Sequence, residues 1–96
     1  MNIKNIKFQE MAVPKGKQAL VYFGDDYKLS VVSNEGSYGG DRGLYEIGVF
    51  KNNDMVEMPG ITEVGDTVKG FLTESDVDVI IKKMTMATGE QPTQIC

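Results

Sequence analysis

A short helical signature near the end of the chain constrains the fold more than any other feature. Thr73 can cap a helix with its side chain, and Asp76 stands at the reciprocal position of a capping box. An apolar stripe at helical spacing follows, formed by Val77, Ile80, Ile81 and Met84. Gly89 suits the end of the helix. The sequence therefore predicts one amphipathic helix at about 74–88, which must cover an apolar face elsewhere in the fold.

The rest of the chain consists of short β-rich runs separated by turns that contain glycine, aspartate or asparagine. The clearest pair is 19–23 and 27–31, joined by Gly24-Asp25-Asp26, which predicts a hairpin. Further short strands are predicted near residues 3–8, 44–51, 55–58 and 67–72. The expected fold is α+β, a mostly antiparallel sheet of five or six short strands packed on the one C-terminal helix. We expect a single domain over residues 1–89 and a frayed tail over residues 90–96.

Composition excludes several kinds of chemistry. The 96 residues contain no histidine and one cysteine, Cys96. Histidine-based catalysis, internal disulfides and imidazole or thiolate metal sites are therefore not expected. Turn formation explains residues 25–26 and 52–54 better than calcium binding, because neither segment continues with the spacing of an EF-hand loop. We predict a protein that is not an enzyme, with no catalytic residues, no metal and no cofactor.

Charge and hydropathy narrow the choice of partners and compartment. The chain has a net charge of −4, and residues 29–81 hold ten acidic and three basic side chains. This acidic middle would repel a phosphate backbone, so direct nucleic-acid binding is not expected, whereas a basic protein surface would be attracted. Neither a signal peptide nor an apolar run of about 20 residues is visible. With no pair of cysteines, the predicted location is the cytoplasm, away from the membrane.

The glycine-rich segment 34–43 is the only stretch that suggests a binding site. It lies between two predicted strands and does not precede a helix, so it matches neither the P-loop nor the dinucleotide fingerprint. Three interpretations remain: a flexible hairpin loop, a loop that contacts another protein, or a cradle of backbone amides for a small anionic ligand. The candidate ligand- or partner-binding residues are Ser37, Tyr38, Gly39, Gly40, Asp41, Arg42 and Tyr45.

Two stretches of the chain resemble a known group of proteins. The loop and strand over residues 36–50 include Tyr38-Gly39-Gly40-Asp41-Arg42-Gly43-Leu44-Tyr45-Glu46, and residues 65–73 end in Gly70-Phe71-Leu72-Thr73. Together with the final helix, they resemble small uncharacterised accessory proteins of bacteriophages and prophages, over about half of the chain. The resemblance implies a phage-encoded protein that acts in the cytoplasm of the host bacterium, and it implies no catalytic residue.

Two functions from different classes follow from these observations. In the first, the protein binds and inhibits a host protein or defence complex through the acidic residues of the segment 35–78. In the alternative, an oligomer sequesters a small nucleotide or signalling ligand in the segment 34–43. A homodimer or higher oligomer is compatible with both, because a short edge strand near residues 55–58 could pair with a second chain.

Overall fold

The sheet is built around one central hairpin. The computed structural model describes residues 1–94 of the chain. Strands β2 (Gly16–Phe23) and β3 (Tyr27–Asn34) pair along their whole length, and β4 (Tyr45–Lys51) pairs with the other edge of β3. The predicted hairpin is confirmed, and both of its strands are longer than predicted.

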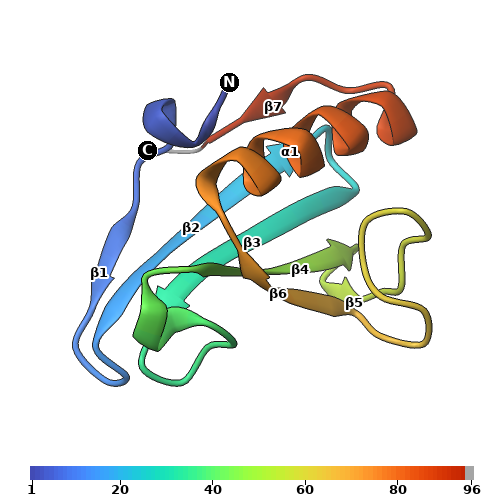
Figure 1. Cartoon of the computed structure of the whole chain (residues 1–96). Coiled ribbons are helices and arrows are strands. Elements are labelled where there is room, and N and C mark those ends of the chain that lie inside the picture. The colour runs from blue at the N-terminus through green and yellow to red at the C-terminus, as the bar shows by residue number, and fades with distance from the viewer. Residues whose placement is uncertain (95–96) are drawn as a thin grey trace.

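Four short strands complete the two edges of the sheet (Figure 1). Strands β1 (Gln9–Met11) and β7 (Pro92–Thr93) pair with successive parts of β2, whereas β5 (Asp54–Met55) and β6 (Val68–Leu72) pair with successive parts of β4. All of these pairings are antiparallel, so residues 1–94 form one seven-stranded antiparallel sheet. The fold is α+β, as predicted, with more strands at the edges than expected.

The helix α1 (Glu74–Thr88) begins and ends where the sequence predicts. The Thr73 hydroxyl accepts the Asp76 amide at 3.2 Å, and the Asp76 carboxylate accepts the Thr73 amide at 3.0 Å. At the other end, Gly89 adopts a φ of +72° and donates its amide to the Thr85 carbonyl. Only glycine takes this left-handed conformation at little cost, so it ends the helix.

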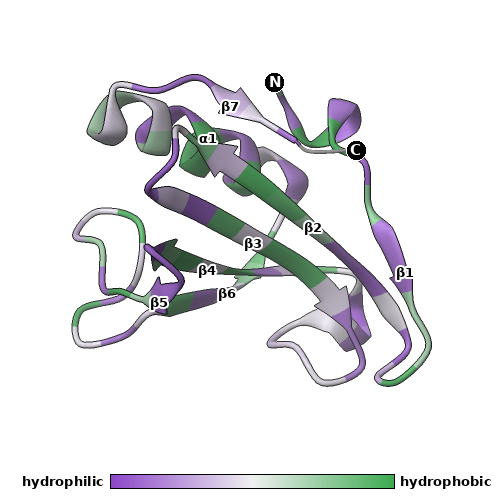
Figure 2. Ribbon diagram, turned by 180° about the vertical axis from the view of Figure 1, so that it is seen from behind, coloured by the Kyte–Doolittle hydropathy of each residue, from purple (hydrophilic) through white to green (hydrophobic). Residues whose placement is uncertain are grey.

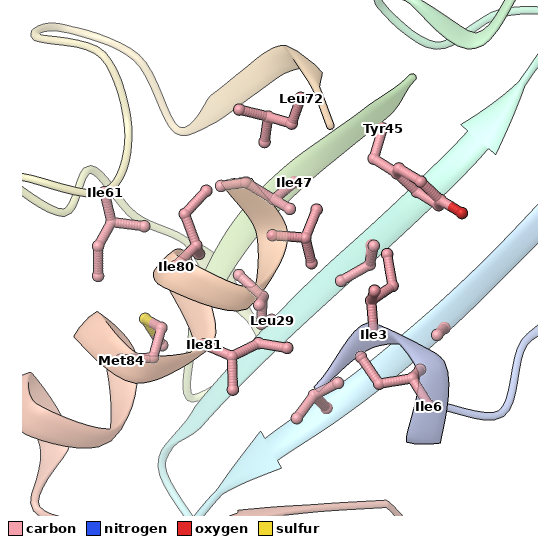
Figure 3. Packing of buried hydrophobic residues seen from close by; sticks show 14 of the residues in the cluster. Ile3, Ile6, Leu29, Tyr45, Ile47, Ile61, Leu72, Ile80, Ile81 and Met84 are labelled. Carbon is pink, nitrogen blue, oxygen red and sulfur yellow. The ribbon is translucent and has the colours of Figure 1, made fainter. Parts of the chain in front are cut away.

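One face of the sheet packs against α1 and forms the hydrophobic core, part of which Figure 3 shows. All residues of the predicted helical stripe are buried. Because successive side chains of a strand point to opposite faces, alternate residues of β2, β3 and β4 meet the stripe: Val21, Phe23, Leu29, Val31, Ile47 and Val49. A 3₁₀ helix, η1 (Ile3–Asn5), closes one end of the core and donates the Ile3 amide to the Asp78 carboxylate at 2.6 Å.

The opposite face of the sheet carries no helix, as Figure 2 shows from behind. Its side chains are half-buried and of mixed polarity, and they include Leu20, Tyr22, Lys28, Ser30, Val32 and Phe50. The Lys28 ammonium group lies 5.2 Å from the centre of the Phe50 ring, so this ring is covered by a cation.

Within residues 1–94, α1 is too short and too polar for a membrane span, and no other helix qualifies.

Two strand predictions are wrong. The strand expected at residues 3–8 is replaced by η1, which the Asn2 side chain caps by accepting the Lys4 amide, and the first strand begins only at Gln9. The strand expected at residues 55–58 is reduced to the two residues of β5. After one more backbone bond, from the Val56 amide to the Val49 carbonyl at 2.9 Å, the chain enters a tight turn in which the Met58 carbonyl accepts the amides of Ile61 and Thr62.

The expected frayed tail is also wrong for residues 90–94. Strand β7 pairs with β2, and the Gln94 carboxamide fills the gap between β7 and β1. This side chain accepts the Lys7 amide at 2.8 Å and donates to the carbonyls of Lys7 and Leu20 at 3.0 and 3.3 Å. The domain therefore extends to at least residue 94. Residues 95–96 of the predicted tail, including Cys96, lie outside the described residues.

Candidate partner-binding surface

The segment between β3 and β4 is an ordered connection stabilised by its own hydrogen bonds (green, lower left in Figure 1). Asn34 accepts the Gly36 amide on its side chain at 2.8 Å, and the Ser37 hydroxyl accepts the Asn34 amide at 2.9 Å. A 3₁₀ helix, η2 (Gly40–Arg42), follows. A Cβ atom on Gly40 would overlap the Asn34 carbonyl oxygen. Only glycine at position 40 therefore lets the backbone there lie so close to the backbone of Asn34. The segment is therefore a defined turn.

Most backbone amides of this segment donate within the protein, and those of Gly39 and Asp41 are the exceptions. The amides of residues 35–38 donate to Lys15, Asn34 and Glu46, and those of residues 40, 42, 43 and 44 donate to carbonyls of residues 37–40. An anion cradle needs several free amides that converge on one point. The geometry therefore favours a protein-contact surface over a small-anion site.

Two of the predicted site residues serve the fold. Tyr45 is only 5% exposed and lies in the core beside Phe8, with 5.9 Å between the ring centroids (Figure 3). The Lys17 ammonium group lies 4.6 Å from the Phe8 ring and 5.3 Å from the Tyr45 ring. Tyr45 thus belongs to the core and not to an accessible site, which corrects its assignment. The Ser37 hydroxyl is likewise committed, since it bonds both the amide and the carbonyl of Asn34.

The remaining predicted residues lie at the surface or shape it. Gly39 and Gly40 start η2 and keep the turn compact. Asp41 and Arg42 are exposed, and neither side chain has a hydrogen-bond or ion-pair partner among residues 1–94. Tyr38 is 61% exposed, which is unusual for so large a ring.

Tyr38 stacks on Phe71 of β6, an aromatic residue that the sequence did not indicate as a binding residue. The two ring centroids are 6.3 Å apart, the rings are inclined by 23°, and the Phe71 side chain is 57% exposed. The Phe71 amide also donates to the Tyr38 carbonyl at 3.1 Å. The stretches that carry the phage resemblance therefore meet at this aromatic pair.

The backbone at Phe71 is strained. Its φ is +57°, a left-handed conformation that costs a residue with a side chain about 1–2 kcal/mol. The register between β4 and β6 shifts between Tyr45 and Ile47, which marks a bulge on β6 at this point. A glycine would satisfy such a bulge without strain, yet the chain places a large exposed ring there. Strain of this kind is a reason to infer a function for the residue.

Neighbouring glycines allow the close approach of the turn to β6. A Cβ atom on Gly70 would overlap the Tyr38 Cβ, and one on Gly39 would lie 3.1 Å from the Phe71 Cα. Position 70 therefore has no room for a side chain while the turn lies this close to β6. The aromatic pair is held between segments that touch backbone to backbone.

Carboxylates lie on the elements next to the aromatic pair. Glu46 of β4 accepts the Tyr38 amide with its Oε1 atom at 2.8 Å. Asp76 lies in the first turn of α1, and hydrogen bonds from the Thr73 amide and hydroxyl hold the pKa of its carboxyl group below the ordinary value, with a smaller contribution from the charge of Lys69. Among residues 1–94 the only ion pair is Lys69–Glu63 at 3.5 Å. Apart from Glu63, the carboxylates of residues 1–94 are therefore not paired with a lysine or arginine of the chain, and their negative charge can attract a basic surface.

Several backbone amides at and before β6 are already occupied and unavailable for further strand pairing. The Asp66 carboxylate accepts the amides of Thr67 and Val68 at 2.8 and 3.2 Å, and the Tyr38 carbonyl occupies the Phe71 amide. A partner strand at this edge would therefore find fewer free backbone donors.

The turns considered for calcium hold no metal-like cluster. Within the described residues, no group of three or more acidic, histidine or cysteine side chains is arranged to bind a metal ion. Residues 25–26 lie in the β2–β3 turn, and Asn53 accepts a hydrogen bond from the Lys28 ammonium group at 3.3 Å.

Comparison of the chain with protein-family models, with curated proteins and with solved structures gives no match. The resemblance to phage accessory proteins therefore stays a prediction. Any function has to be inferred from the residues of this chain.

Proposed function

We propose that this chain is a non-enzymatic protein-binding module whose docking surface is centred on the Tyr38–Phe71 pair. The observation that supports the proposal most directly is an exposed aromatic stack on a strained backbone. Aromatic residues are enriched among the side chains that dominate binding energy at protein interfaces. A rigid pair also loses little conformational entropy when it binds.

The acidic surroundings of the pair suggest the chemistry of the partner. Glu46, which accepts the Tyr38 amide, and the other acidic residues of the segment 35–78 favour a partner with a basic surface and would accelerate their association. Together with the phage resemblance, this supports an inhibitor that occupies a basic surface of a host protein. The bacterial cytoplasm is the proposed compartment, because Cys96 has no second cysteine in the chain with which to form a disulfide.

Affinity capture from bacterial lysate tests the proposal. The wild-type chain should retain one partner in a saturable, stoichiometric complex at low salt, and retention should weaken as ionic strength rises. Tyr38→Ser should abolish capture. Met86→Ser is the matched control, since Met86 is 83% exposed on the far half of α1 and should not contribute. Equal capture by wild type and Tyr38→Ser would overturn the proposed surface.

Arg42→Ala separates this proposal from the nucleotide-binding alternative. A surface for a basic partner should bind as well or better without Arg42, because a like charge is removed. A site for an anionic ligand should lose its ligand. Native mass spectrometry of the purified protein provides the second readout. A retained nucleotide-sized mass that disappears in Arg42→Ala would support the alternative.

A further inference from the structure

The protein covers three of its six partly exposed aromatic rings with its own lysines. Three lysines lie within 5.5 Å of ring centres: Lys17 over Phe8 and Tyr45, Lys28 over Phe50, and Lys51 over Tyr27. Of the other rings, Phe23 is buried and Tyr22 is half-buried. Tyr38 and Phe71 are the most exposed rings of the described chain, and no cation of residues 1–94 lies over either.

We infer that the aromatic pair takes an arginine side chain of the protein partner, an inference that rests on the proposed function. The faces of aromatic rings carry partial negative charge and attract a guanidinium group. Arginine stacks flat on such faces and is more weakly hydrated than lysine, so less hydration is lost on binding. The nearly parallel rings of Tyr38 and Phe71 suit a planar cation better than a compact ammonium group.

Glu46 supplies a matching acceptor at the Tyr38 backbone. One of its carboxylate oxygens, Oε1, accepts the Tyr38 amide, and Oε2 has no hydrogen-bond partner within the described residues. A guanidinium group over Tyr38 could therefore donate an N–H to a charged oxygen. Charge-assisted bonds of this kind are about twice as strong as neutral ones.

The cations of the chain nearest in sequence leave the rings open. Lys69, two residues before Phe71, is paired with Glu63 at 3.5 Å. Arg42, four residues after Tyr38, lies on η2 and is not placed over either ring. A cation bound over either ring would therefore come from another molecule.

Matched peptides test this inference by NMR titration of the whole chain. The probe is a blocked pentapeptide of glycines with a central arginine, and its control carries citrulline, which keeps the shape and removes the charge. We expect saturable shifts at Tyr38, Phe71 and Glu46, and binding of the citrulline peptide about 5-fold weaker. Tyr38→Leu keeps an apolar side chain and removes one aromatic ring. The arginine preference, which is the ratio of the affinities for the arginine and citrulline peptides, should therefore fall to nearly one.

Two further variants sharpen the test. Phe50→Leu is the control, because the Phe50 ring is already covered by Lys28, and the arginine preference should not change. Phe71→Leu repeats the test from the second ring, in case Tyr38→Leu does not fold. Equal binding of both peptides to the wild type, or an unchanged preference in the folded Tyr38→Leu and Phe71→Leu variants, would overturn the inference.

These outcomes are distinguishable from a failure of the proposed function. If lysate capture depends on Tyr38 but the peptides bind equally, the docking surface stands and the arginine inference is overturned. If capture does not depend on Tyr38, the proposed function is overturned whatever the peptides show.

Discussion

The contact between Gly70 and Tyr38 makes the strongest test of how the candidate surface is built. Gly70→Ala adds a Cβ atom that would overlap the Tyr38 Cβ, so the turn has to move away from β6. Carbon atoms pack at about 3.5–4.0 Å, so the required shift is about 1–2 Å. The Phe71 amide and the Tyr38 carbonyl, now 3.1 Å apart, would then separate beyond hydrogen-bond distance.

The losses can be added from typical magnitudes. The broken hydrogen bond costs about 1 kcal/mol, and the weakened aromatic stack costs about 0.5–1.5 kcal/mol. We expect Gly70→Ala to lower the free energy of unfolding by about 2 kcal/mol, which agrees with the usual cost of overpacking. For a domain of this size the corresponding fall in Tm is about 8–16 °C.

Urea denaturation followed by far-UV circular dichroism measures this effect against a matched glycine. A Cβ atom on Gly36 would lie 3.5 Å or more from its neighbours, so Gly36→Ala should change the free energy by less than about 0.5 kcal/mol. Tyr38→Gly removes the Cβ atom that the methyl group introduced by Gly70→Ala would strike. In that background the penalty of Gly70→Ala should fall by more than half. The close-contact argument would be refuted if Gly70→Ala and Gly36→Ala lowered the free energy of unfolding equally. It would also be refuted if Gly70→Ala lowered this free energy as much in the Tyr38→Gly background as in the wild type.

Two other predictions concern the edges of the fold. Gln94→Ala removes the hydrogen bonds to Lys7 and Leu20 and should lower the free energy of unfolding by about 1 kcal/mol, with faster amide exchange in β7 than in α1. An unchanged free energy of unfolding would mean that the carboxamide does not stabilise this edge. Asp76 has a lowered pKa in the folded state, so its carboxylate stabilises the protein above the unfolded-state value of about 4, and this contribution is lost as the pH falls through the folded value. The difference in unfolding free energy between wild type and Asp76→Ala should therefore be constant at neutral pH and shrink in acid, and a difference independent of pH would contradict the capping-box interpretation.

The parts of the fold that the sequence predicts correctly depend on local signals. The helix boundaries follow from Thr73, Asp76 and Gly89, which act within a few residues of their partners. The β2–β3 hairpin follows in the same way from a short turn between two apolar runs. In each case the chemistry that decides the structure is contained in a window of about 15 residues.

Two of the failures, at residues 3–8 and 90–94, depend on contacts between distant residues, whereas the one at residues 55–58 involves a local turn at Met58. Nothing in the polar segment around Gln94 indicates that its side chain will bridge Lys7 and Leu20, because the bonds cross more than 70 positions of sequence. The alternation of Ile6 and Phe8 favours a strand in the N-terminal run. Burial of Ile3 and Ile6 in the core beside α1 favours η1 instead.

Only half of the candidate surface is visible in the sequence. Tyr38 stands out because it lies in a glycine-rich segment, whereas Phe71 has the pattern of an ordinary residue in a predicted strand. The positive φ at Phe71 arises from the bulge between β4 and β6, which depends on the register of two strands far apart in the chain. The glycine just before Phe71 is the one available signal, since a glycine within a strand often marks a bulge or a close backbone approach.

The edge of β2 has a consequence for how the protein is made. Its outer edge is covered partly by β1 and partly by β7, and Gln94 closes the gap between them. A ribosome therefore synthesises nearly the whole domain before the residues that seal this edge emerge. During that interval β2 presents unpaired backbone groups to its surroundings. A chain truncated before residue 92 would keep that exposure permanently, so we expect it to associate with itself at concentrations where the longer chain does not.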